Sequence, residues 1–173
     1  MILMLIGLCI VLFDVNLAAG NAYIGIFPDM LGYGMMVLAL SKVQTKTPAH
    51  EKLLKTCRIA VLASAIVYIA ALLGIGRLLE GWLWIALDLG CFALESYVAY
   101  LLVALMKEHD TTHARDIGKQ LTSGWRVSVL FGAVAFCSIL SPASTMLLTG
   151  FSAVADISFL TACFKNASKC PCM

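Results

Sequence analysis

Three carboxylates stand inside long apolar stretches of this sequence, where a charged side chain is costly. Asp88 and Glu95 occur in the run 81–106, and Asp156 occurs in the run 142–164. On membrane-insertion scales, a charge at the centre of a helix costs about 2.5 to 3.5 kcal/mol, so such groups face a bundle interior, pair or stay neutral. Two kinds of chemistry follow: a structural ion pair, or a polar path that binds a proton, a cation or a small cationic or polar solute.

The depth of these groups can be counted along the helices. Glu95, Asp156 and Arg126 each lie 14 residues from one end of their apolar run, assigned below as the outer end. At helical rise this places all three about 21 Å from that end. We therefore expect Glu95 and Asp156 to share Arg126, with Arg58 as the second candidate, although both arginines can also extend to the cytoplasmic interface. In the solute-path interpretation, Asp88 connects this cluster to the outer side.

A polar segment, residues 13–34, interrupts the apolar N-terminal region. Its candidate interior residues carry carboxyl, amide or phenol groups: Asp14, Asn16, Asn21, Asp29 and Tyr33. We expect this segment to be the outward connection between the first two helices, with polar side chains serving backbone groups that lipid cannot satisfy. A capped first turn after Pro28 would explain Asp29, because free N–H groups and the helix dipole stabilise a carboxylate there. Asp14 has no such explanation.

Composition places the whole chain in the membrane class. Hydrophobic residues make up 61% and charged residues 13% of the 173 residues, against about 25% charged in a soluble domain. The apolar runs predict an all-α, polytopic transmembrane helix bundle that forms a single domain over residues 1–173. Six helices are predicted, over residues 1–13, 28–42, 53–73, 81–106, 125–140 and 142–164. The first, second and fifth are shorter than the roughly 20 residues of a standard span.

The basic residues predict an orientation. Eleven of the twelve lysines and arginines fall in the loops 42–58 and 107–126 or in the C-terminal tail, and only Arg77 falls on the other side. By the positive-inside rule, both termini are then cytoplasmic. A five-helix alternative, in which residues 1–42 form a hairpin that never crosses, would keep the same loops inside.

Several other functions lack the necessary pattern. The N-terminal run has no basic start and continues into a second apolar run, which disfavours a signal peptide. The seven cysteines show no paired zinc spacing, so we expect no metal site and no cofactor. The terminal CPCM formally fits a prenylation pattern on Cys170, but a plain cytosolic tail is the simpler interpretation. No HExxH or GxSxG motif occurs, and the three histidines lie in the inner loops, so we expect no enzyme.

The N-terminal motif resembles a family. The stretch LFDVN, followed by YIGIFPDMLGYG, is similar to the signature of a loose group of small, uncharacterised bacterial multi-helix membrane proteins. The matching residues follow an FDxN…PDxxGY pattern: Phe13, Asp14, Asn16, Pro28, Asp29, Gly32 and Tyr33. This resemblance covers about a quarter of the chain and implies a topology in a bacterial membrane, but no catalytic residue.

Three functions are compatible with these features. We expect an integral, multi-pass protein of the bacterial cytoplasmic membrane that binds or translocates a small solute or ion through a carboxylate-lined interior. A non-catalytic accessory subunit of a larger membrane complex is the alternative. A vitamin-transporter binding subunit, similar in length and topology, is a second alternative, although the first helix lacks the Ala-x-x-x-Ala face typical of such subunits. The expected partners are the bilayer, anionic lipid headgroups at the inner face, and a membrane protein or a second copy of the chain; no nucleic acid is expected.

Overall fold

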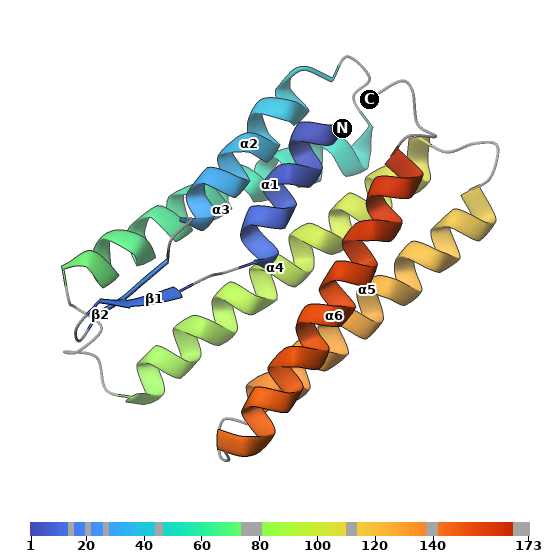
Figure 1. Cartoon of the computed structure of the whole chain (residues 1–173). Helices are drawn as coiled ribbons and strands as arrows, with labels where there is room; N and C mark the ends of the chain where they lie inside the picture. The colour runs from blue at the N-terminus through green and yellow to red at the C-terminus, as the bar shows by residue number, and fades with distance from the viewer. Residues whose placement is uncertain are drawn as a thin grey trace. The chain divides into compact units, whose positions relative to one another are not determined.

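The computed structural model describes residues 1–13, 16–19, 22–25, 28–43, 47–73, 81–109, 114–137 and 142–167. Within these ranges the chain forms six helices and one two-stranded hairpin (Figure 1). In chain order they are α1 (Ile2–Leu12), β1 (Asn16–Ala19), β2 (Ala22–Gly25), α2 (Asp29–Ser41), α3 (Pro48–Leu72), α4 (Gly81–His109), α5 (Ala114–Cys137) and α6 (Pro142–Ala167).

Contacts divide the chain into two compact units, Leu3–Val98 and Ala99–Met173, with the boundary inside α4. The expectation of a single bundle domain over the whole chain stays a prediction.

The six predicted helices are confirmed. The ends differ most at the starts of α3 and α5, which begin at Pro48 and Ala114, earlier than the predicted residues 53 and 125. Hydropathy marks where hydrocarbon begins, whereas a helix begins where its first N–H groups find partners. At α3 the Thr47 side chain accepts a hydrogen bond from the backbone N–H of His50, at 3.3 Å, and Pro48 occupies the first turn. A polar first turn therefore precedes the apolar part of the helix.

Three described helices are long and apolar enough to cross a membrane. The qualifying segments are Pro48–Leu72, Ile85–Glu108 and Leu148–Ala167. α1 and α2 are apolar but shorter. The 24-residue α5 is amphipathic, so its sequence combines an apolar face with a polar one. These properties are compatible with a membrane location.

The strands β1 and β2 were not predicted. They pair antiparallel, with Asn16 opposite Gly25 and Ala19 opposite Ala22, which leaves two residues between them. The pairing satisfies backbone groups that polar side chains had been expected to serve. The described part of the chain is therefore not purely helical.

The first unit is built on a close approach of two helix backbones. A Cβ atom added to Gly7 of α1 would lie 2.5 Å from the carbonyl oxygen of Gly32 in α2, and one added to Gly32 would lie 2.6 Å from that of Gly7. Small residues allow such backbone contact between apolar helices. α2 also packs against α3. There His50, 2% exposed, lies 2.9 Å from the Leu40 carbonyl oxygen through its Nε2 atom.

The second unit is built on the hairpin of α5 and α6, which run side by side (Figure 1). Gly124 of α5 lies against Phe159 of α6: a Cβ atom added to the glycine would be 3.5 Å from the Phe159 ring, an ordinary contact. Trp125, the next residue, meets Tyr100 of α4 with ring centroids 5.2 Å apart. The α5 helix therefore has packing partners on two adjacent faces.

Candidate functional site

Asp156 lies half-buried in the candidate span of α6. Its carboxylate accepts a hydrogen bond from the Ser128 hydroxyl of α5. Ser152, one turn earlier in α6, is a second hydroxyl neighbour of this carboxylate. These two hydroxyls are neutral donors that hold its oxygens in place and supply no compensating charge.

The neighbour of Asp156 differs from the one predicted. Arg126 is exposed, and Ser128, two residues later in the same helix, makes the contact. Two residues correspond to about 200° around a helix, so Arg126 lies near the face opposite Ser128. Counting from helix ends placed Asp156 level with this part of α5 but could not determine which face meets it. Glu95 belongs to the other unit, and its pairing with Arg126 or Asp156 stays a prediction.

A second polar group of residues lies in the first unit, around Tyr33. This tyrosine of α2 is 2% exposed. Glu95 of α4 and Asp29 of α2 lie close enough to its hydroxyl to interact electrostatically, as do the thiols of Cys57 and Cys91. Three predicted interior residues, from the first turn and middle of α2 and the middle of α4, therefore gather in one region.

The remaining predicted residues lie elsewhere. Asp88 of α4 and Arg58 of α3 are exposed. Asn16 lies in β1, where its backbone pairs with Gly25. Asp14 and Asn21 lie outside the described residues.

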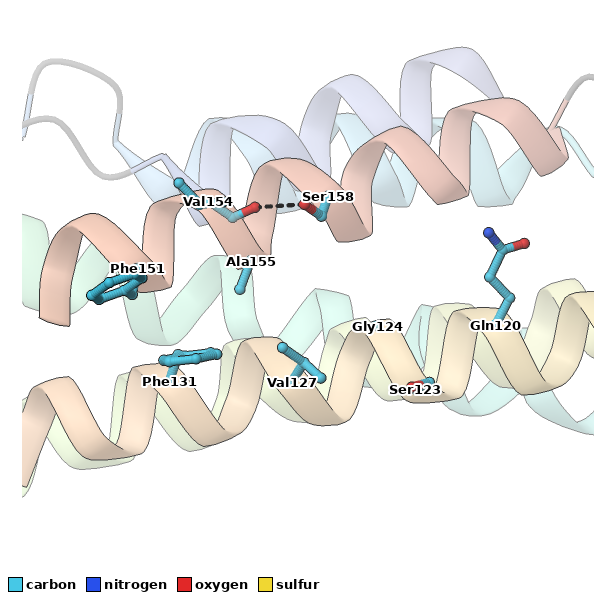
Figure 2. A pocket seen from close by; sticks show the side chains of 9 residues that line it. All are labelled: Gln120, Ser123, Gly124, Val127, Phe131, Phe151, Val154, Ala155 and Ser158. Carbon is cyan, nitrogen blue, oxygen red and sulfur yellow. Dashed lines mark hydrogen bonds between the residues drawn. The ribbon is translucent and has the colours of Figure 1, made fainter.

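The structure also contains a groove between α5 and α6 that was not predicted, with a volume of about 490 Å³. Figure 2 shows Phe131 and Phe151 facing each other at one end, Gln120 at the other, and Val127 and Ala155 between them. The two phenyl rings are stacked, with centroids 6.0 Å apart. The groove is lined by Gln120, Ser123, Gly124, Val127, Phe131, Phe151, Val154, Ala155 and Ser158.

A sequence signal for this groove exists. Gln120, Gly124, Val127 and Phe131 recur at spacings of four, three and four residues, which places them on one helix face. Gly124 has no side chain in the middle of that face, so the α6 side chains opposite it determine the size of the groove there. Only the packed hairpin identifies the residues of α6 that complete the lining.

The donor set does not favour a metal centre. Among the residues that the structure describes, no three His, Cys, Asp or Glu side chains are grouped to hold a metal ion. The carboxylate of Asp156 lies against two hydroxyl groups instead. Such a site suits proton exchange or weak binding of a monovalent cation or amine better than tight coordination of a transition metal. Comparison of the chain with protein-family models, curated proteins and solved structures gives no match.

Proposed function

We propose that the chain is a multi-pass integral protein of a bacterial cytoplasmic membrane, with both termini in the cytoplasm. The three helices long enough to cross a bilayer support the membrane location. The placement of eleven of the twelve basic residues in the loops 42–58 and 107–126 or in the tail supports the orientation. The bacterial origin rests on the resemblance of the N-terminal motif.

Cysteine labelling tests this topology. In a background without the seven native cysteines, a membrane-impermeant maleimide added to intact cells should label a cysteine at Gly76. It should leave cysteines at Lys46 and Lys119 unlabelled until the membrane is permeabilised. The reverse pattern would exclude the orientation.

Within this topology, the protein binds or translocates a proton, a monovalent cation or a small cationic solute. The observation that carries this proposal is the carboxylate of Asp156, held by Ser128 inside a candidate span. A charge at such depth is costly, and a hydroxyl does not neutralise it. The group is stable as the protonated acid or with a bound cation, so it can exchange one for the other. The proposal includes no catalytic step.

Proton flux into proteoliposomes tests this function. Vesicles that contain the purified protein and a trapped pH-sensitive dye, with sodium on one side only, should dissipate a pH gradient faster than protein-free vesicles. Asp156→Asn removes the exchangeable proton and should reduce this flux to that of protein-free vesicles. Glu51→Gln, which removes an exposed carboxylate in the first turn of α3, should leave the flux unchanged. Equal flux in the wild type and Asp156→Asn would contradict the proposal.

An accessory subunit remains the second candidate. One face of α3 is apolar and more than half exposed along its length, through Ile59, Leu62, Ile66 and Ile69. Lipid can cover this face, but so can a helix of another membrane protein. Replacement of Leu62 and Ile66 by phenylalanine should displace a partner helix while leaving flux intact. The accessory role would be favoured if this variant loses a co-purifying membrane protein and if neither the wild type nor the variant shows proton flux.

A further inference from the structure

The groove between α5 and α6 changes in polarity along its length. Gln120, Ser123 and Ser158 supply the polar groups, and they lie toward one end. The Ser158 hydroxyl donates to the Val154 carbonyl oxygen at 2.8 Å (Figure 2), so it also satisfies its own helix. The other end is closed by the stacked rings of Phe131 and Phe151. A molecule that fits this groove is therefore polar at one end and hydrocarbon at the other.

The dimensions agree with an acyl chain. From Gln120 to Phe131 the groove follows eleven residues of helix, or about 16 Å at 1.5 Å per residue. One leaflet of a bilayer has about 15 Å of hydrocarbon, half of the total of about 30 Å. The volume of about 490 Å³ lies within the range of roughly 300 to 1,000 Å³ that is typical of small-molecule sites.

A positive charge lies at the polar end. Lys119 directly precedes Gln120 in the sequence and is exposed. Its ammonium group is thus available near the place where a lipid headgroup would lie. Charge complementarity selects an anionic headgroup over a zwitterionic one.

We propose that this groove is a binding site for one anionic phospholipid, with an acyl chain along Val127 and Val154 and the headgroup beside Lys119. The proposal rests on the membrane location argued above, but not on the transport function. The lipid stabilises the α5/α6 hairpin by filling the groove that the two helices line. This site differs from general attraction of the inner loops to the membrane surface, because it retains a single lipid molecule through detergent extraction.

Native mass spectrometry of the purified full-length protein tests the site. The protein is mixed with equimolar phosphatidylglycerol and phosphatidylcholine of identical acyl chains, and the lipid retained per chain is counted. We expect one retained lipid, with phosphatidylglycerol favoured. Lys119→Gln should reduce that preference about fivefold, the effect of one lysine near a lipid surface, worth about 1 kcal/mol. Lys55→Gln, an exposed lysine of α3, is the matched control and should keep the preference.

A second pair of variants tests the acyl-chain part. Val154→Phe places a phenyl ring at a groove residue that is 61% exposed, and Leu130→Phe places the same ring at an α5 residue that is also 61% exposed but does not line the groove. Val154→Phe should lower the retained lipid at least about tenfold, while Leu130→Phe should not. Equal retention of the two lipids by the wild type, or equal effects of the two phenylalanine variants, would overturn the proposal. If either result is obtained while cysteine labelling supports the proposed orientation, only the lipid site is refuted. Reversed cysteine labelling would refute the topology.

Discussion

The contact between Gly7 and Gly32 predicts a position where a single methyl group cannot be accommodated. In Gly32→Ala, the new Cβ atom would lie 2.6 Å from the Gly7 carbonyl oxygen and 2.7 Å from a methyl carbon of Val11. Real Cβ atoms essentially never approach other atoms within 3.0 Å, and the oxygen belongs to the backbone. α1 and α2 must therefore move apart, which weakens packing along both helices. Overpacking of this kind typically costs about 1 to 3 kcal/mol.

The same helix provides its own control. Gly34, two residues later, has no atom within 4 Å of its added Cβ. Both substitutions gain the helix propensity of alanine over glycine, about 0.5 to 1 kcal/mol. That gain cancels in the comparison. The difference between Gly32→Ala and Gly34→Ala therefore isolates the cost of separating the two backbones, expected at about 1 to 3 kcal/mol.

The measurement is the free energy of unfolding in mild detergent, obtained by titration with a denaturing detergent and followed by circular dichroism. Gly34→Ala should be as stable as the wild type or slightly more stable, and Gly32→Ala should be less stable. Gly7→Ala should resemble Gly32→Ala, because its added Cβ atom meets the Gly32 carbonyl oxygen at 2.5 Å. If Gly32→Ala and Gly34→Ala unfold at the same denaturant fraction, the close approach of α1 and α2 is refuted.

Three further substitutions test other contacts by the same unfolding titration. His50→Ala removes a buried ring hydrogen bond and should lower the unfolding free energy by at least about 1 kcal/mol, whereas Lys52→Ala, exposed in the same helix, should change it by less than about 0.5 kcal/mol. Ser128→Ala leaves its carboxylate partner on α6 short of a donor and should cost about 1 to 3 kcal/mol; the exposed Ser123→Ala should be close to neutral, and equal losses would contradict the assigned contact. Thr47→Ala removes the cap of α3 and should cost about 1 kcal/mol, while Thr47→Ser should retain most of it.

Hydropathy was sufficient to predict the helices, because in lipid a backbone satisfies its polar groups within a helix and an apolar run has few alternatives. The same reasoning was insufficient between α1 and α2. The residues Gly20 and Asn21 stand between two short runs, and such a dipeptide is a recognised hairpin signal. The polar residues around it also fit helix capping and a polar site, so the sequence alone does not select the hairpin. The strands β1 and β2 show that backbone pairing provides much of the local satisfaction instead.

The neighbours of the polar side chains could not be predicted for a different, geometric reason. Residue counting gives the depth of a side chain along its helix but leaves its direction free, because direction turns by 100° with every residue. Arg126 and Ser128 differ by only about 3 Å in depth, yet only Ser128 bonds to Asp156. By contrast, Glu95 of α4 lies close enough to Tyr33 of α2 to interact with it electrostatically, a proximity that depends on helix packing and cannot be deduced from residue spacing.

The identity of the neighbour changes what Asp156 can do. An arginine would have supplied a fixed positive charge, and breaking a buried pair from one side typically costs about 3 to 5 kcal/mol, which describes a structural element. The Ser128 hydroxyl holds the carboxylate oxygen in place. It can stay hydrogen-bonded to Asp156 whether that acid is ionised or protonated, because a hydroxyl both donates and accepts. The charge of Asp156 is therefore balanced by whatever the site exchanges with its surroundings. An acid inside a candidate span whose neighbours, among the residues that the structure describes, are neutral hydroxyls is the arrangement expected where protons or cations bind reversibly, and this is why the proposed function rests on this residue.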